Sequence, residues 1–421
     1  MSKKITLAII AAATLCSIAV AGCSEPDPTD EPAGTASSAI TSPVGLELVP
    51  ISPCRIVDTR LSGGLMAGSE TRTFTPTASP CGIPSDAKAL AVNTTVVPSG
   101  PLGFVTMWPA GEAQPLASTL NAVRGEVVAN SAIVPMGASG QISAFVSNPT
   151  HLIIDVQGYF RLPNGAGSLF YPVTPCRVVD TRLTNQTIAA VSSITVSIPA
   201  SCGVAGNATA YSYNVTAVPK GPVGYVTTWP AGTTMPVAST LNAPSGAVTA
   251  NGAIVAAGPL RATSIFADAA TDIVIDINGY FAPPSASGLP YFPVSPCRAV
   301  DTRVGQGKSG PFGPPALYPL AERTLPLAAS GCSIPANAKA VATNFTTVAP
   351  GPLGFLTTWA AGQTRPLAST LNSPRGGVVA NAALVPTNGT GAINVFATET
   401  TELIVDVSGY FAPASSTGPC M

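Results

Sequence analysis

The sequence predicts an all-β protein made of three tandem antiparallel β-sandwich domains, of jelly-roll or immunoglobulin-like topology. The segment CRIVDTR at 54–60 returns with small changes at 176–182 and 297–303, and each copy continues through a W-x-AG turn, an ASTLN segment and a closing D-x-x-GYF strand. The copies have the length of independent domains, about 100–150 residues, whereas solenoid units have about 20–50. Short apolar–polar alternation recurs in each copy, and no stretch sustains a helical period.

Alternation and turn residues indicate seven strands within the first copy. The alternation is clearest at 89–96 (ALAVNTTV), and the turn sequences PSGP at 98–101 and GASG at 137–140 separate neighbouring strands. Seven short strands in a segment of about 100 residues are typical of a β-sandwich. The expected strands span 55–59, 72–76, 87–97, 104–108, 127–136, 142–146 and 152–160.

These patterns divide the chain into six segments. They are a signal peptide with a lipidated cysteine at 1–23, a disordered tether at 24–45, β-sandwich repeats at 46–162, 168–283 and 289–413, and a C-terminal tail at 414–421. The joins between repeats are short and contain aromatic residues, which restricts interdomain freedom. We therefore expect a bent rod, and a compact pseudo-threefold cluster, in effect a trimer in one chain, is the alternative.

The first 23 residues have the features of an export signal. Lys3 and Lys4 precede an apolar run over 5–21, and VAGC at 20–23 ends it. This ending resembles the lipobox of bacterial lipoproteins, which implies that Cys23 carries lipid and anchors an exported protein to the membrane of the bacterial cell envelope. Ser24 follows in place of Asp, and by the same resemblance this favours the outer membrane of a Gram-negative host. An ordinary signal peptide or an uncleaved anchor is the alternative.

Composition limits the partners and the compartment. Charged residues make up 9% of the chain, and 19 Lys and Arg against 20 Asp and Glu leave no basic surface for nucleic acid. A zinc site would need more ligands than two cysteines per copy, and His151 is the only histidine, so we expect no metal and no cofactor. Cys420 is left over as a free thiol or a link between chains. Two cysteines recur in every copy, and in an exported chain they predict the disulfides Cys54–Cys81, Cys176–Cys202 and Cys297–Cys332.

Two arginines and two aspartates return in every copy. We interpret them as a partly buried ion-pair network that joins the first and last strands of each domain through bidentate bonds. The alternatives are a ligand site or a carboxylate pair for glycoside hydrolysis. The members are Arg55, Asp58, Arg60, Asp155, Arg177, Asp180, Arg182, Asp276, Arg298, Asp301, Arg303 and Asp406.

The tryptophan of each copy, together with the asparagine that ends ASTLN, is a candidate ligand-binding set. An indole flanked by Asn, Ser and Thr suits a sugar or a peptide, and core tryptophans with structural amides are the alternative. The candidates are Trp108, Asn121, Trp229, Asn242, Trp359 and Asn372. Two more asparagines recur in every copy, and we expect their amides to bond loop backbone. They are Asn93, Asn214 and Asn344, and Asn130, Asn251 and Asn381.

The full motif set, PCR-x-VDTR, TTW-x-AG, ASTLN and D-x-x-GYF, resembles a module of exported bacterial proteins that has no settled activity. The resemblance implies a surface location and a β module, and it carries over no functional residues. With no serine–histidine pair and no phosphate loop we assign no catalytic residue and predict that the protein is not an enzyme. We predict a surface-exposed lipoprotein that acts as a structural or adhesive multivalent display protein, whose partner is a cell-surface glycan or an envelope protein. A carbohydrate-binding, lectin-like protein is the alternative, and a hydrolase is a third possibility.

Overall fold

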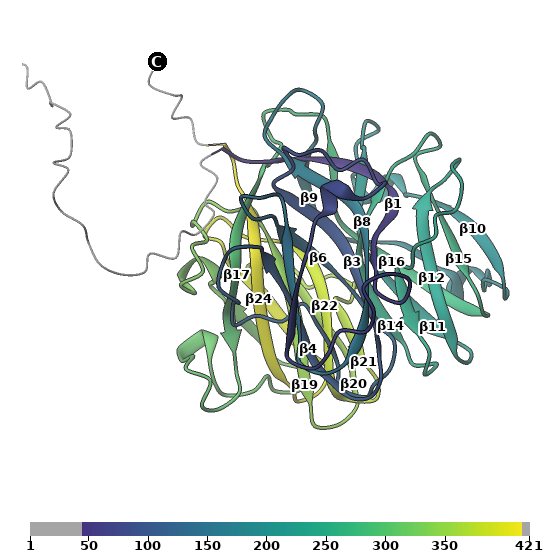
Figure 1. Cartoon of the computed structure of the whole chain (residues 1–421). Coiled ribbons are helices and arrows are strands. Elements are labelled where there is room, and N and C mark those ends of the chain that lie inside the picture. The colour runs from purple at the N-terminus through teal and green to yellow at the C-terminus, as the bar shows by residue number, and fades with distance from the viewer. Residues whose placement is uncertain (1–43, 415–421) are drawn as a thin grey trace, which may run out of the picture. The chain divides into compact units, whose positions relative to one another are not determined.

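The computed structural model describes residues 44–414. The signal peptide with Cys23, most of the tether, Cys420 and most of the tail lie outside the described residues. Strands make up 53% of the structure and helices 4%, which confirms the all-β class (Figure 1).

Each repeat contributes two four-stranded antiparallel sheets. In repeat 1 the first sheet has the strand order β1-β8-β3-β6 and the second has the order β2-β7-β4-β5. The same two orders return in repeat 2, as β9-β16-β11-β14 and β10-β15-β12-β13, and in repeat 3, as β17-β24-β19-β22 and β18-β23-β20-β21. The repeated sequence therefore folds into a repeated pair of sheets.

The elements have the following bounds. Repeat 1 contains β1 Glu47–Asp58, β2 Glu70–Phe74, β3 Ala89–Pro98, β4 Leu102–Pro109, β5 Leu120–Ala122, β6 Val128–Pro135, β7 Ile142–Val146 and β8 Thr150–Arg161. Repeat 2 contains β9 Leu169–Asp180, β10 Ser192–Ser197, β11 Ala210–Pro219, β12 Val223–Pro230, β13 Leu241–Ala243, β14 Thr249–Ala256, β15 Ala262–Ala267 and β16 Thr271–Ala282. Repeat 3 contains β17 Tyr291–Asp301, β18 Glu322–Leu325, β19 Ala340–Ala349, β20 Leu353–Ala360, β21 Leu371–Ser373, β22 Gly377–Pro386, β23 Ile393–Ala397 and β24 Glu402–Phe411. The helices are short, namely α1 Thr181–Thr184 and the 3₁₀ turns η1 Pro76–Ala78, η2 Ala200–Cys202, η3 Gly310–Phe312 and η4 Leu327–Ala329.

The strand that sequence analysis missed in repeat 1 is β5, which lies inside the ASTLN segment. Three residues are too few to show an alternating pattern. The first strand was also expected to begin at residue 55, whereas β1 begins at Glu47, because the Pro50/Cys54 irregularity in its pairing with β8 interrupts the alternation.

Apolar residues form four cores. Three lie between the two sheets of a single repeat, as Val92 of β3, Val105 of β4 and Ile154 of β8 do in repeat 1. The fourth is shared by all three repeats and includes Ile133, Ile254 and the aromatic residues at the repeat ends. The shared core joins the repeats into one body.

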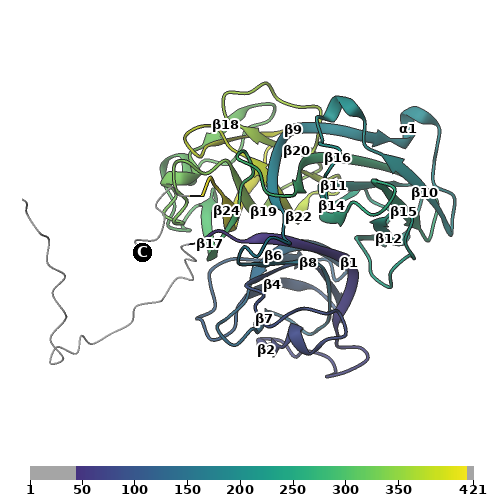
Figure 2. The ribbon, with the colours of Figure 1, turned by 90° about the horizontal axis from the view of Figure 1, so that it is seen from above.

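The prediction of three tandem β-sandwich domains is wrong, because the six sheets are arranged as a six-bladed β-propeller. The end strands of the six sheets contact one another in a closed ring, in the order β6, β5, β22, β21, β14, β13 and back to β6. Figures 1 and 2 both place β6, β14 and β22 at the centre of the three repeats. The expected bent rod is therefore also wrong, since repeat 3 contacts repeat 1. Alternation within one copy indicates the strands but not which sheet edges meet across copies.

The central strands run from one end of the ring to the other. Val128 of β6 lines a depression at one end, and Ile133 of the same strand lies in the shared core at the other. The described chain begins and ends at the shared core, where Leu46 forms a β-bridge with Tyr291 and the N–H of Ala412 donates to the carbonyl of Pro290 at 3.4 Å. We call this the closed end and the opposite end the far face.

The glycine of the closing GYF motif is required by a close approach of strands. A Cβ atom at Gly158 would lie 2.9 Å from Cδ1 of Leu48 and 3.0 Å from the carbonyl oxygen of Val49. Only glycine lets β1 and β8 approach this closely. The same crowding surrounds the equivalent glycines, Gly279 and Gly409.

Candidate functional site: the repeat junctions and the far face

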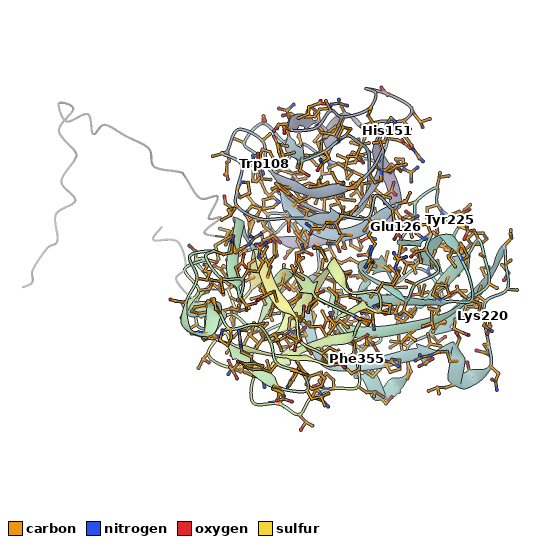
Figure 3. The ribbon with its side chains drawn as sticks, turned by 90° about the horizontal axis from the view of Figure 1, so that it is seen from below. Trp108, Glu126, His151, Lys220, Tyr225 and Phe355 are labelled. Carbon is orange, nitrogen blue, oxygen red and sulfur yellow. A yellow bond between two sulfur atoms is a disulfide. The ribbon has the colours of Figure 1, made fainter. Side chains whose placement is uncertain are left out.

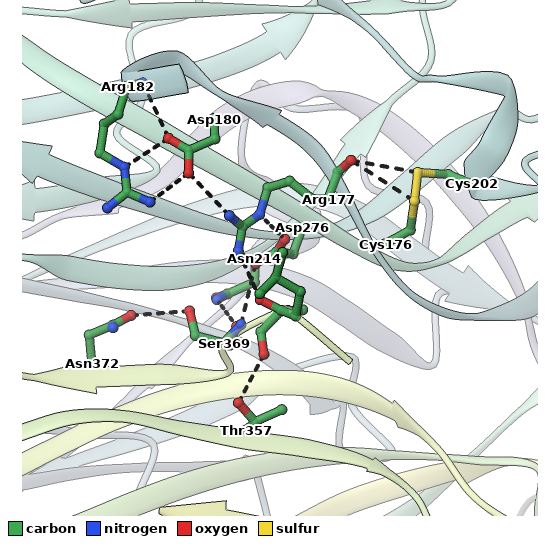
Figure 4. Close-up of polar contacts among 12 residues, drawn as sticks. Cys176, Arg177, Asp180, Arg182, Cys202, Asn214, Asp276, Thr357, Ser369 and Asn372 are labelled. Atoms are coloured by element: carbon green, nitrogen blue, oxygen red, sulfur yellow. Dashed lines mark hydrogen bonds and ion pairs between the residues drawn. A yellow bond between two sulfur atoms is a disulfide. The ribbon is translucent and has the colours of Figure 1, made fainter. Parts of the chain in front are cut away.

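The recurring arginines and aspartates form one ion-pair network in each repeat. In repeat 1, Nε of Arg55 donates to Oδ1 of Asp155 at 2.8 Å and Nη2 donates to Oδ2 at 3.1 Å. Nη1 of Arg55 also bonds Asp58 at 3.3 Å, and Asp58 in turn accepts from Arg60 at 2.9 and 2.7 Å. The network connects β1 to β8, which are the first and last strands of the repeat. Figure 4 shows the equivalent network of repeat 2.

The two aspartates of a network have different electrostatic environments. The hydrogen bond from Arg60 lowers the pKa of Asp58, and the bond from Arg182 does the same to the pKa of Asp180. Burial raises the pKa of Asp155, while the hydrogen bond from Arg55 opposes that rise. We call Asp155 and its equivalents, Asp276 and Asp406, the inner aspartates. Ionising an inner aspartate costs more free energy than ionising the other aspartate of the network, so its charged form depends on the arginine partner.

Each inner aspartate also contacts the ASTLN serine of a neighbouring repeat. The N–H of Ser118 in repeat 1 donates to Asp406 of repeat 3 at 2.9 Å. The N–H of Ser369 in repeat 3 donates to Asp276 of repeat 2 at 3.4 Å, and the backbone of Ser239 in repeat 2 bonds Asp155 of repeat 1. The three contacts follow one direction around the ring, so each repeat donates to one neighbour and accepts from the other.

The serine carbonyls accept hydrogen bonds from the first set of recurring asparagines. Nδ2 of Asn93 donates to the carbonyl of Ser239 at 2.6 Å, with equivalent bonds from Asn214 to Ser369 at 2.6 Å and from Asn344 to Ser118 at 2.7 Å. These bonds again join different repeats. We expected these amides to bond loop backbone, and the structure places that backbone in the neighbouring repeat.

The second set of asparagines completes the junctions near the centre. Nδ2 of Asn130 donates to Oδ1 of Asn344 at 2.8 Å and to the carbonyl of Thr119 at 2.6 Å, and its Oδ1 accepts from the N–H of Ala382 at 3.0 Å. Asn251 and Asn381 repeat this pattern with Asn93 and Asn214. The recurring polar residues therefore hold the repeats together, and the inner carboxylates are enclosed by arginine and serine.

The predicted ligand-binding tryptophans are buried. Trp108, Trp229 and Trp359 are 4%, 6% and 1% exposed, and each indole N–H donates to a carbonyl four residues later, at 2.9, 3.0 and 2.8 Å. Their faces therefore offer little surface to a sugar.

The asparagines paired with them in that prediction bond within their own repeat. Asn121, Asn242 and Asn372 donate to the carbonyls of Gly103, Gly224 and Gly354 at 2.8, 2.6 and 3.0 Å. The structure thus does not bring indole and amide together as one open site.

Sequence analysis missed three aromatic pairs on the second sheets. Phe104 contacts Phe145 with 5.6 Å between ring centroids, and Phe355 contacts Phe396 at 5.9 Å. Tyr225 pairs with Phe266 at 5.6 Å in repeat 2. Phe104 and Phe355 are each 36% exposed. The sequence does contain a signal for these pairs, because an aromatic residue recurs three positions after the Gly-Pro turn of every copy, as Phe104, Tyr225 and Phe355.

The aromatic pairs lie toward the far face. Phe104 stands on β4 between Leu102 and Val105, which pair with Ala122 and Leu120 of β5, and Ala122 lines the depression on the axis. Figure 3, drawn from the opposite side to Figure 2, labels Tyr225, Phe355 and the central Glu126. Three equivalent aromatic surfaces therefore surround one end of the ring.

The lining of the depression at the centre of the far face includes three equivalent valines, Val127, Val248 and Val378. Its rim is asymmetric, because Arg375 pairs with Glu126 at 2.5 Å, whereas repeat 2 carries Ser245 and Ala247 at the equivalent positions. The charged rim thus joins repeats 1 and 3.

The predicted disulfides are confirmed, with Cα–Cα distances of 5.7, 5.5 and 5.7 Å for Cys54–Cys81, Cys176–Cys202 and Cys297–Cys332. Three disulfides are typical of a protein that is exported to an oxidising compartment. Within residues 44–414, no helix is long and apolar enough to cross a membrane. Over the same residues, no group of three or more His, Cys, Asp or Glu side chains could hold a metal ion.

No protein-family model matches the chain, and no curated protein matches it.

Proposed function

We propose that this protein is an exported, lipid-anchored surface protein that binds a partner multivalently through its far face. The observation that carries the proposal is the threefold repetition of a partly exposed aromatic pair at the end of the ring opposite to both ends of the described chain. Aromatic rings provide large contact areas at low cost in side-chain entropy. A lipid anchor at Cys23 would attach the body through residue 44, at the closed end.

Repetition supports multivalent binding rather than catalysis. Three weak sites on one rigid body raise avidity by about 10²–10⁴ over one site. The recurring carboxylates, in contrast, are held by arginine side chains and by the neighbouring serine, so they are poorly placed to act as a general acid and base. We therefore propose a non-enzymatic role.

The partner class we favour is a cell-surface glycan, which makes this a lectin-like display protein. The supporting observation is that a hydroxyl group flanks the exposed ring in repeats 1 and 3, although in repeat 3 the guanidinium of Arg365 also lies over the ring of Phe396, 3.7 Å from its centroid. Ser147 accepts from the N–H of Phe104, and Thr398 accepts from the N–H of Phe355. A flat apolar face beside hydroxyl groups suits a sugar ring better than a charged peptide.

The test is binding of the soluble chain, residues 44–421, to an array of cell-surface glycans and isolated envelope polymers. The test variants are Phe104→Ala, Tyr225→Ala and Phe355→Ala, singly and together. The matched control replaces three equally repeated, exposed apolar residues that are not members of the aromatic pairs. They are Leu116, Val237 and Leu367, which are 76%, 84% and 85% exposed.

We expect each single aromatic variant to weaken binding and the triple aromatic variant to abolish it, with the control triple unchanged. Equal loss in both triples would refute the role of the aromatic pairs. Binding by a single-site variant as tight as the unmodified chain would refute multivalency. No binding to any glycan would assign the far face to an envelope protein instead.

A further inference from the structure

A pocket of about 420 Å³ lies at the junction of repeats 2 and 3, near the closed end. Its walls include the segment 172–175 of repeat 2, Trp359, and Lys339 with Pro386 of repeat 3. Pockets of about 300–1,000 Å³ are the usual size for small-molecule sites. We propose that this pocket binds a small organic carboxylate with an apolar body.

The charge of the pocket comes from Lys339. This lysine is half-buried, and its backbone groups are already used, since its N–H donates to Phe411 at 2.8 Å and its carbonyl accepts from Thr387 at 2.9 Å. Within residues 44–414 its ammonium group makes no hydrogen bond or ion pair, and no acidic side chain lines the pocket. An ammonium group without a protein partner at the wall of a pocket favours a bound anion.

The remaining walls favour an organic anion over an inorganic one. Pro172, Pro175 and Pro386 present apolar ring surfaces, and Trp359 forms part of the wall with its indole N–H already bonded to the carbonyl of Gln363. The side chains of Thr174 and Gln363 supply neutral polar groups at the exposed edge. A ligand could place its carboxylate group near the ammonium of Lys339 and pack its apolar part against the proline rings.

The other two junctions differ from this one at the position of Lys339 or Gln363. At the junction of repeats 3 and 1, Glu112 takes the place of Gln363, and the hydroxyl of Ser295 donates to its carboxylate at 2.5 Å. At the junction of repeats 1 and 2, Thr209 replaces Lys339 and donates to Ser168 at 2.8 Å. The junction of repeats 3 and 1 therefore already contains the carboxylate of Glu112, and the junction of repeats 1 and 2 has no lysine at the position of Lys339. This pocket is independent of the far face and its aromatic pairs.

Isothermal titration of the full chain with two matched pairs of probes tests the proposal. The pairs are benzoate with benzamide, and cyclohexanecarboxylate with cyclohexanecarboxamide, so that each carboxylate has an apolar body and a neutral counterpart of similar shape. The variants are Lys339→Gln, which removes the charge, and Lys339→Arg, which keeps it. Lys88→Gln is the control, because Lys88 occupies the equivalent position in repeat 1 and is exposed.

We expect at least one carboxylate to bind with one site per chain, and its neutral counterpart to bind at least tenfold more weakly. Lys339→Gln should lower that affinity by about tenfold, which corresponds to about 1.4 kcal/mol, whereas Lys339→Arg and Lys88→Gln should retain it. The proposal is overturned if the neutral probes bind equally well or if the two glutamine variants lose affinity equally. It is also overturned if neither carboxylate binds at millimolar concentration.

Discussion

Replacing Asn130 with alanine should destabilise the protein far more than an ordinary surface substitution. The side chain is 1% exposed and makes three hydrogen bonds, to Thr119 at 2.6 Å, to Asn344 at 2.8 Å and from Ala382 at 3.0 Å. A hydrogen bond contributes about 0.5–1.5 kcal/mol net, and each buried group left unsatisfied costs about 1–3 kcal/mol. Because Asn130 itself is buried and its three partners are buried or half-buried at the junction, we expect a loss of about 3–5 kcal/mol in the free energy of unfolding.

This substitution also tests closure of the ring. Two of the three partners, Asn344 and Ala382, belong to repeat 3, which a linear rod would hold away from repeat 1. The assay is urea denaturation followed by tryptophan fluorescence. The control is Asn121→Ala, which removes a single bond to Gly103 inside repeat 1 and should cost about 1 kcal/mol. Equal, small losses in both variants would show that the repeats do not depend on the asparagine junctions.

Three further outcomes follow from the same structure. Asp406→Asn should cost about 3 kcal/mol in urea denaturation, because it removes the buried carboxylate that binds two nitrogens of Arg298 and leaves Asp301 as the only charged partner of that guanidinium in the described chain. Glu126→Gln at an exposed pair should cost less than about 1 kcal/mol. Removing the disulfide of repeat 3 by the double variant Cys297→Ser, Cys332→Ser should cost about 4 kcal/mol in the same assay, since the bond closes a 35-residue separation, and a change below 1 kcal/mol would contradict the loop-entropy argument. In each variant that keeps one of the three tryptophans and replaces the others with phenylalanine, the unfolding midpoint from fluorescence should equal the midpoint from circular dichroism of the whole chain, whereas different midpoints within one variant would mean that the repeats unfold independently.

The sequence was sufficient to predict the elements and the covalent bonds. Alternation located seven of the eight strands of repeat 1, and one cysteine pair per copy predicted the three disulfides. The recurring arginines and aspartates were expected to join the first and last strands, and Arg55 of β1 does bond Asp155 of β8. These features are local or lie within one copy, where a repeated pattern carries enough information.

The arrangement of the sheets could not be predicted in the same way. Contacts between copies join residues far apart in the sequence, up to 214 positions for Asn130 with Asn344 among the asparagine pairs, and nothing in the sequence near either residue indicates its partner. A polar asparagine on an edge strand suits a loop contact and a junction equally well. The tryptophans illustrate the same difficulty, because a motif with one indole per copy is compatible with a ligand site or with a buried turn.

The structure distinguishes two kinds of residue. Some recur because their polar groups bond one repeat to the next, and others have exposed groups that could bind a partner. Asp406 and Ser118 recur in every copy, and their polar groups are used in joining one repeat to the next. A surface that binds a partner must instead use atoms that the junctions leave exposed. The aromatic rings of the far face and the ammonium of Lys339 meet that condition, and only the rings are repeated three times. Threefold repetition of an exposed surface supports avidity, whereas a feature present at one junction supports a single small ligand, so the two sites should respond to different substitutions.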